Sequence, residues 1–431
     1  MKRTLLPQQN LLFPSNLNPP HPLRKYELLF ENLNASPLES TTACEGRHPI
    51  SKPAILKSFI YRNLKAFTTL YSLAMDLIDN EGISTICGLP QTRNIQTLIE
   101  RLSSFLKNTP NHLLQNIRQN IILELMELGE IKGTCLAIDS SCVYAQVKEN
   151  NLNSSIKDRF DKFKFPKGDT DSRLSVHVEF PKPFKKEIKY FWGYRNHVVW
   201  DAKSELPVAE ITKPANVSEQ SLFIPLFAQT KTDFNFSIEE VLADAGYDAE
   251  YLLNFVINNL KAKPFIAKNI RWAAHSNVKV TNTGLSCAAG FPMIYWGKFK
   301  DRGKIRLKYV CPITHSKSFA KKYLVCPWNH PKFIKGKGCF AYRRGDADIR
   351  NTINYGSAAF KTTYHQRTSA ERGFSRLLTF CMQTPSVRGL NAIANYCTIA
   401  HITVLLIALT AVKSGNKDKI RFIRKFLPNL S

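Results

Sequence analysis

Apolar side chains recur three and four residues apart between residues 53 and 130, with Lys and Arg among them. Residues 53–80, 94–108 and 111–133 show this spacing, which predicts amphipathic helices. We expect the third helix to begin near Thr109 to His112, where Pro110 is tolerated in a first turn. The pattern predicts a helical domain over residues 51–130. Helical spacing alone fits a DNA-binding module and a structural cap on the next domain equally well.

Beyond Gly133 the spacing becomes that of strands. Residues 134–141 form a short apolar run, and residues 188–216 alternate in the manner of a hairpin with its turn at Asp201 to Leu206. A polar stretch, residues 148–175, is predicted to be a loop. Helix and strand patterns then alternate through residues 218–269. This order predicts a mixed α/β sheet with crossover helices over residues 131–271.

Residues 272–350 interrupt that alternation and predict an inserted, β-rich segment. Aromatic and β-branched residues dominate residues 291–299, 305–313 and 323–328, which we expect to be short strands. From residue 296 to 350 there are fifteen Lys or Arg against three Asp or Glu. Residues 351–431 return to a helical pattern. Their apolar run at 394–412 predicts a buried core helix rather than a membrane anchor, because Asn395 and His401 interrupt it and no second span exists.

The net charge of +26 is the strongest global feature and favours a polyanionic partner, most simply nucleic acid. A hydrophobic fraction of 44% excludes wholesale disorder. Residues 1–50, rich in Pro, Asn and Ser, predict a flexible basic arm with no signal-peptide pattern. The expected compartment is therefore the cytoplasm.

Ten cysteines are too few for a disulfide scaffold in 431 residues, so reduced thiols are expected. Four of them fall in the insertion and could hold zinc: Cys287, Cys311, Cys326 and Cys339. Their spacings are wide and contain no C-x2-C pair, which favours ordinary thiols.

Three carboxylates stand where metal chemistry is plausible. Asp139 and Asp244 come at the carboxyl ends of two predicted strands, where ligands gather in α/β sheets. Glu371 lies in a predicted helix over residues 364–378. Oxygen ligands of this kind suit Mg²⁺ or Mn²⁺. Two such ions about 4 Å apart can activate the attacking oxygen and stabilise the leaving oxygen of a phosphodiester.

Tyr364, Arg367 and Glu371 fall at i, i+3 and i+7, so on one continuous helix they would share a face. A phenol, a guanidinium and a carboxylate would then point into one site. The alternative is a solvated face whose Arg–Glu pair contributes about 0.3 kcal/mol.

Four segments in order resemble the DDE transposases of bacterial insertion sequences, in the group with a Tyr-x2-Arg-x3-Glu-x6-Lys signature. They are AIDSS at 137–141, GYRNH at 193–197, DAGYD at 244–248 and YHQRTSAER at 364–372. The resemblance implies an RNase H-like mixed sheet with flanking helices, a β-rich insertion and an N-terminal helical domain. Residues 131–271 would be the first part of the catalytic domain, 272–350 the basic insertion and 351–431 its C-terminal helices.

By this resemblance the chain is a metal-dependent nuclease and strand transferase for DNA, acting on terminal inverted repeats and target DNA. Asp139 would bridge two Mg²⁺ (or Mn²⁺) ions, with Asp244 and Glu371 each completing one. Pairing two ends implies a homodimer, associated with the bacterial nucleoid. The residues expected to contact DNA are Tyr364, Arg367, Arg195, His197, Trp296 and Trp328. The tryptophans could stack on an unpaired base or pack between strands, and His197 could orient a phosphate or be structural.

One position departs from the signature: Leu378 stands where Lys is expected. Either another basic residue substitutes for that Lys or end binding is weakened. Two alternatives therefore stay open, a degenerate or domesticated copy that only binds DNA and an RNase H-like nuclease without transposition.

Overall fold

The computed structural model describes residues 23–39, 50–91, 94–182, 185–269, 279–281, 284–329, 331–345, 349–355 and 357–423. It divides into two compact units, one of Met1–Leu242 with His365–Ser431 and the other of Ala243–Tyr364. The helical pattern of residues 53–130 falls in the same unit as the sheet that follows it. The domain boundaries given above remain predictions.

The N-terminal part is helical, as the apolar spacing predicted. Side-chain caps start several helices: Ser51 accepts from the Ala54 N–H at 3.3 Å and Asn94 from the Thr97 N–H at 2.9 Å. Part of the predicted flexible arm is ordered as α1 and a 3-10 turn, while residues 1–22 and 40–49 lie outside the described residues. The helices are α1 (Arg24–Glu31), α2 (Lys52–Lys65), α3 (Leu70–Asp79), α4 (Glu81–Cys87), α5 (Ile95–Asn108) and α6 (Asn111–Glu127).

The sheet of this unit is mixed, as predicted. β1 (Cys135–Tyr144) pairs antiparallel with β3 (Lys185–Asp201) and parallel with β5 (Glu240–Ala243). β3 turns into β4 (Leu206–Pro214), which confirms the predicted hairpin and its turn. α7 (Glu219–Phe234) connects β4 to β5. Antiparallel strands on one side of β1 and a parallel strand on the other make this an RNase H-like sheet.

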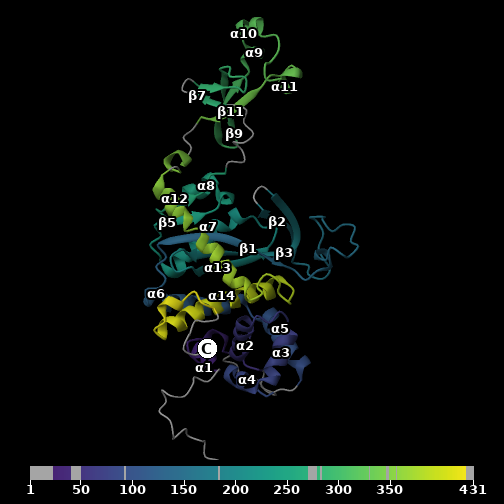
Figure 1. Cartoon of the computed structure of the whole chain (residues 1–431), viewed down its shortest axis with the longest axis vertical. Coiled ribbons are helices and arrows are strands. Elements are labelled where there is room, and N and C mark those ends of the chain that lie inside the picture. The colour runs from purple at the N-terminus through teal and green to yellow at the C-terminus, as the bar shows by residue number, and fades with distance from the viewer. Residues whose placement is uncertain are drawn as a thin grey trace, which may run out of the picture. The chain divides into compact units, whose positions relative to one another are not determined.

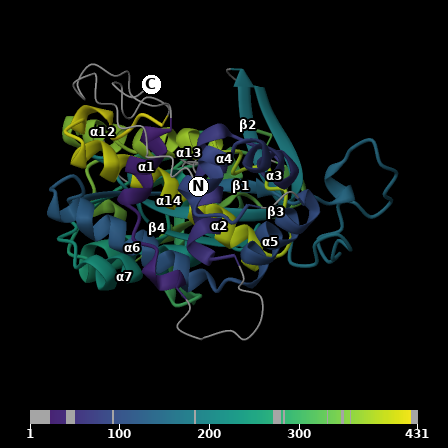
Figure 2. The same cartoon turned by 90° about the horizontal axis from the view of Figure 1, so that it is seen from below.

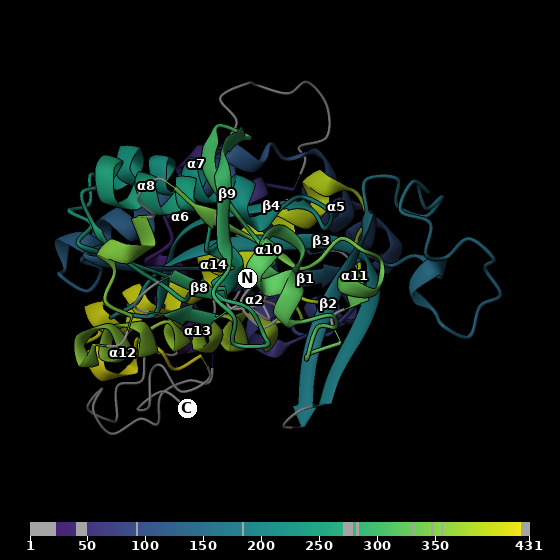
Figure 3. The ribbon, with the colours of Figure 1, turned by 90° about the horizontal axis from the view of Figure 1, so that it is seen from above.

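The sequence pattern does not predict β2 (Arg173–Lys182), because it assigns residues 148–175 to a loop and no strand to residues 176–187. It pairs antiparallel with the first half of β3, Arg173 opposite Gly193, and the two strands form an arm that extends beyond the sheet (Figures 2 and 3). Val176, Ile188 and Tyr190 remain exposed on it. β2 is thus held by pairing with a long neighbour rather than by burying a face, so it has no clear hydrophobic signature.

The apolar run near the C-terminus is a buried core helix, as predicted. α14 (Leu390–Lys413) is long and apolar enough to cross a membrane, but 94% of its most apolar window is buried in the protein. It lies between the sheet and the N-terminal helices (Figure 1) and packs against α6, α5 and β4. The two interrupting polar residues bond inside the unit. Asn395 donates to the Leu106 and Thr109 carbonyls at 2.9 and 2.8 Å, and His401 Nε2 lies 2.9 Å from Asn196 Oδ1.

The second unit contains the predicted insertion. Expected strands appear at β9 (Ile294–Asp301) and β10 (Lys304–Val310), but residues 323–328 form no strand, and β11 (Phe340–Arg344) pairs with β10 instead. Leu324 and Val325 are 87% and 64% exposed, while Cys326 beside them is buried in a small apolar cluster, so the stretch is only partly buried. Other elements here are α8 (Glu250–Asn254), β6 (Lys263–Ile266), β7 (Lys279–Thr281), β8 (Gly284–Ser286), α9 (Pro312–His315), α10 (Lys317–Lys322), α11 (Pro331–Ile334) and α12 (Ala358–His365).

Candidate active site

One guanidinium joins two of the candidate carboxylates, although they lie 232 positions apart in the chain. Arg367 Nη2 lies 2.5 Å from Glu371 Oε1, and its Nη1 lies 4.0 Å from Asp139 Oδ2. The side chains of Asp139 and Glu371 are 27% and 54% exposed, so their oxygens can be reached from solvent. Asp139 on β1 and Glu371 on α13 (Thr368–Leu378) therefore open onto the same place.

Asp139 is not at the carboxyl end of its strand, contrary to the prediction. β1 continues five residues further, to Tyr144, because β3 pairs with it up to Tyr144 opposite Gly193. The parallel pairing with β5 stops earlier, at Ala137 opposite Leu242. Asp139 thus lies two residues beyond the point where β1 loses its parallel neighbour.

The predicted continuous helix over residues 364–378 is wrong. α12 ends at His365, Gln366 and Arg367 form a turn, and α13 begins at Thr368. The Thr368 hydroxyl donates to the His365 carbonyl at 3.0 Å, and this local bond competes with helix continuation. Arg367 and Glu371 remain neighbours across one turn, whereas Tyr364 belongs to α12, where its ring stacks on Phe360 at 5.8 Å.

α13 approaches the sheet closely because Gly373 has no side chain. A Cβ at Gly373 would lie 2.4 to 2.6 Å from three ring atoms of Trp200, which is fully buried on β3. Phe374 packs edge-on against the same indole, with ring centroids 5.2 Å apart. Glu371 is therefore positioned two residues before a contact that only glycine permits.

In the second unit, the DAGYD segment forms a tight turn directly after β5. Asp244 caps a 3-10 turn over Ala245–Tyr247, accepting the Gly246 N–H at 2.9 Å. Tyr247 is buried, and Asp248 is bound by Arg350 Nε at 2.7 Å and by the Asn269 N–H at 2.8 Å. Asp248 thus stabilises the turn, while Asp244 presents a partly exposed carboxylate.

Beside Asp139, Ser140 takes part in a small ionic network. The Ser140 hydroxyl donates to Glu219 at 2.7 Å, and Arg195 Nη1 lies 2.5 Å from the same Glu219 oxygen. Arg195 is only 16% exposed and also donates to the Val176 carbonyl at 2.8 Å. Glu219 thus compensates the charge of Arg195 within the protein. The network reaches Ser140, the residue that follows the candidate catalytic Asp139.

His197 lies opposite Ser140 in the sheet and is fully buried. Burial, with a smaller contribution from Arg195, lowers its pKa to about 3, so the ring is neutral at physiological pH. A side chain without exposed surface does not reach DNA in this arrangement, which favours the structural alternative for His197.

Leu378 is the last residue of α13 and is 39% exposed. Arg376, the nearest basic residue, does not replace the missing Lys, because its Nη1 binds Glu205 Oε2 at 2.9 Å and its side chain is 13% exposed. Arg372 and Arg421 contact the same carboxylate, at 2.8 and 3.2 Å. Three guanidiniums therefore surround Glu205.

The candidate base-stacking residues lie on the second unit. Trp296 and Trp328 are 58% and 57% exposed, and Trp296 stands edge-on to His315 at 4.7 Å. Phe299 and Tyr342, also exposed, are neighbours across the β9–β10–β11 sheet, with centroids 5.6 Å apart. Both tryptophans are thus accessible, as stacking on a base would require.

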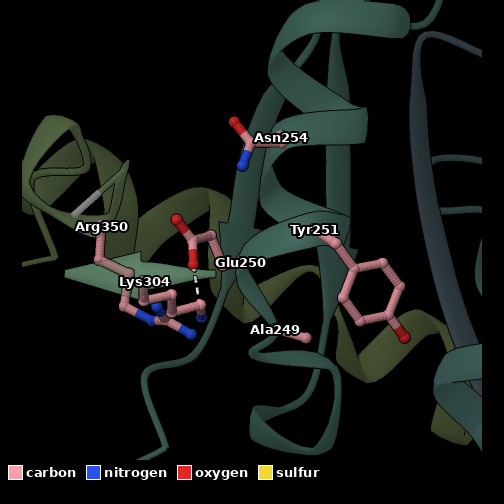
Figure 4. A pocket seen from close by; sticks show the side chains of 6 residues that line it. All are labelled: Ala249, Glu250, Tyr251, Asn254, Lys304 and Arg350. Atoms are coloured by element: carbon pink, nitrogen blue, oxygen red, sulfur yellow. Dashed lines mark ion pairs between the residues drawn. The ribbon is translucent and has the colours of Figure 1, made fainter. Parts of the chain in front are cut away.

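The second unit also carries a pocket in which Glu250 pairs with Lys304 at 2.7 Å (Figure 4). Arg344 binds Glu250 as well, and these cations hold the pKa of Glu250 below its usual range. The lining residues are Ala249, Glu250, Tyr251, Asn254, Lys304 and Arg350. The pocket contains none of the three candidate carboxylates.

The four insertion cysteines lie in two apolar clusters, with Cys287 in one, Cys311 and Cys326 in the other, and Cys339 packed against both. Within the described ranges, no three His, Cys, Asp or Glu side chains are gathered as a metal site. For a hard divalent cation the fit rests on donor chemistry. Asp139 and Glu371 supply accessible carboxylate oxygens that approach the same guanidinium, that of Arg367.

Comparison with known proteins adds the family. Residues 132–406 match the family model described as "Transposase DDE domain". Among solved structures, the chain is similar to the piggyBac transposase synaptic complex with hairpin DNA, at 12% identity and a TM-score of 0.37, over 95% of this chain and 79% of that chain. No curated protein sequence matches. Because the family match covers more than half of the chain, including the sheet, Asp139, Asp244 and Glu371, this protein belongs to the DDE transposases, enzymes that cut and join DNA with divalent metal ions.

Proposed function

We propose that Asp139, Asp244 and Glu371 are the catalytic carboxylates of this transposase. The observation that carries the proposal is the position of Arg367, whose guanidinium contacts Glu371 at 2.5 Å and approaches Asp139 to 4.0 Å. Two acidic side chains from distant segments share one cation at an accessible surface. A guanidinium between two carboxylates offsets the repulsion between their negative charges.

Asp244 enters the proposal through strand register. β1 and β5 run parallel, and their last paired residues are Ala137 and Leu242. Asp139 is the second residue after Ala137, and Asp244 is the second residue after Leu242. β5 ends at Ala243, so Asp244 begins the turn that follows the strand. The equal offsets and the resemblance of the DAGYD segment support its inclusion in the proposal. Capping of the following turn by Asp244 limits the mobility of its carboxylate.

The metal is proposed to be Mg²⁺, or Mn²⁺, with two ions per site, because the three donors are all carboxylates. Asp139 would contact both ions, and Asp244 and Glu371 one each. When bound, such ions stabilise charge on the attacking and leaving oxygens of the phosphodiester. Arg367, released from the carboxylates, would hold a phosphate of the transposon end together with Tyr364.

The proposed substrate is double-stranded DNA carrying the terminal inverted repeats. The enzyme would hydrolyse a strand at each end, and the freed 3′-OH would then attack target DNA in line. Pairing of two ends favours a homodimer, which would act on chromosomal DNA in the cytoplasm of a bacterium. Trp296 and Trp328 would stack on bases beside the cleaved end.

The direct test is cleavage of labelled inverted-repeat DNA by three isosteric variants, Asp139→Asn, Asp244→Asn and Glu371→Gln. Each should abolish Mg²⁺-dependent cleavage and retain DNA binding. The matched control is Glu127→Gln, which removes an exposed carboxylate at the end of α6. Near-wild-type cleavage by any of the three variants, or an equal loss of cleavage in the control, would refute the assignment.

One observation favours a second candidate, a copy that binds DNA without transposing it. Leu378 occupies the signature Lys position, and Arg376 is bound to Glu205. Metal-dependent cleavage of terminal-repeat DNA would exclude this candidate. Detection of joined transposon–target products, rather than nicks alone, would exclude a nuclease without transposition.

A further inference from the structure

The turn between β3 and β4 collects more positive charge than its own carboxylates balance. Glu205, with its side chain only 4% exposed, is contacted by Arg372 at 2.8 Å, by Arg376 at 2.9 Å and by Arg421 at 3.2 Å. We call these four residues the Glu205 cluster. It joins the β3–β4 turn, α13 and the segment after α14, all within the first unit.

The surrounding charges do not cancel this excess. The other carboxylate of the turn, Asp201, is buried and accepts the backbone N–H groups of Gly133 and Ser204, each at 2.8 Å. Lys203, exposed in the same turn, adds a further cation near Thr134. Among the described residues, Asp201 and Glu205 carry two negative charges against four positive charges on Lys203, Arg372, Arg376 and Arg421, so this group has a net charge of +2.

One arginine suffices to satisfy Glu205. Arg376 binds the carboxylate with Nη1 and the Glu205 backbone carbonyl with Nη2, and its side chain is 13% exposed. Burial lowers the pKa of Arg376, Glu205 opposes this effect, and Arg421 and Arg372 make smaller contributions that lower the pKa further. Arg372 and Arg421 are 54% and 44% exposed, and ion pairs of that kind add little to stability.

Half-exposed guanidiniums in excess of their carboxylate are suited to a polyanion. Arg421 also donates from Nε and Nη2 to the Ser204 and Lys203 carbonyls, at 3.3 and 2.5 Å, and Arg372 from Nη1 to the Thr368 hydroxyl at 2.8 Å. The Nη groups carry two N–H donors each, so both arginines keep N–H groups that can bind phosphate oxygens. Arg372 directly follows Glu371 on α13, about 100° around the helix, so DNA held at Glu371 passes close to it. At the C-terminal end of α13, Leu378 has no charge to bind a phosphate and Arg376 is bound to Glu205.

We infer that Arg372 and Arg421, oriented by Glu205, bind the phosphodiester backbone of the DNA and replace the Lys missing at position 378. This inference rests on the proposed function, because it assumes that DNA reaches Glu371. Glu205 is a positioning residue here. It fixes two arginines in place before DNA arrives, while Arg376 neutralises it.

The test measures binding of a fluorescent inverted-repeat duplex by anisotropy, across salt concentrations and without divalent metal. Arg372→Gln and Arg421→Gln should each weaken binding roughly threefold to tenfold and reduce the slope of log affinity against log salt by about 0.9, one phosphate contact. The double variant should reduce this slope by about 1.8. Arg372→Lys should retain the slope, because the charge remains.

The matched control is Lys413→Gln, which removes a cation paired one-to-one with Glu124 at 2.6 Å. It should leave the slope unchanged. Unchanged slopes in the arginine variants, or an equal decrease in the control, would overturn the inference. Denaturant unfolding of each variant identifies loss of fold, and where one of the two single Gln variants does not fold, the slope of the other decides. Since no cleavage is measured, failure here is distinct from failure of the triad assignment.

Discussion

Gly373→Ala offers a direct test of how α13 positions Glu371. The new Cβ would lie 2.4 Å from Trp200 Cζ3, and ordinary contact begins near 3.4 Å, so helix and indole must separate by about 1 Å. Trp200 cannot readily withdraw, because it is fully buried between Phe374 and His401. We therefore expect α13 to move away from the sheet and to take Glu371 with it.

The expected magnitudes separate stability from catalysis. Overpacking costs about 1–3 kcal/mol, and replacing glycine by alanine within a helix returns about 1 kcal/mol. The net loss of stability should be about 0–2 kcal/mol, measured by urea unfolding. A 1 Å displacement of a catalytic group can reduce the rate about 100-fold. Cleavage of inverted-repeat DNA should therefore fall far more than stability does.

A compensating variant makes the test specific. Trp200→Phe removes the ring atoms that collide with the new Cβ, and in the described part of the chain the Trp200 indole N–H has no hydrogen-bond partner to lose. The double variant Gly373→Ala/Trp200→Phe should recover cleavage, with a coupling energy of about 0.5–3 kcal/mol. Ser375→Ala, exposed on the same helix, is the control and should leave cleavage unchanged. Wild-type cleavage by Gly373→Ala, or no recovery in the double variant, would refute the reasoning.

Two further predictions follow from the same unit. Burial lowers the pKa of His197 to about 3 and of His401 to about 4, both below the unfolded value, so unfolding takes up protons and stability falls as pH drops below about 6.5. The free energies of unfolding at pH 7.5 and pH 5.5 should therefore differ by about 2–3 kcal/mol. A flat pH profile, or a His197→Leu variant with the same pH difference as the wild type, would contradict this. Leu378→Lys should restore a phosphate contact and steepen the salt dependence of DNA binding by about 0.9, whereas an equal change in Ser375→Lys would show that the position is not special.

Much of the fold followed from periodicity, because burial imposes a repeat of 3.6 on helices and of 2 on strands. That repeat located the N-terminal helices, the β3–β4 hairpin and α14. It failed at β2, whose apolar side chains are exposed, and at residues 323–328, which are apolar but lie outside any sheet. The exposed apolar side chains of β2, and Leu324 and Val325, show that an apolar residue need not be buried, and a sequence pattern gives only the residue types.

The sequence by itself determined the residue types of the candidate site and their order: Asp139, Asp244, Arg367 and Glu371 within motifs that resemble one family. Only the tertiary structure decided which of them meet. It places Arg367 against both Asp139 and Glu371, commits Arg376 to Glu205 and buries His197. These outcomes depend on strand register and on packing between segments more than a hundred residues apart, and no local pattern of side chains encodes such distances.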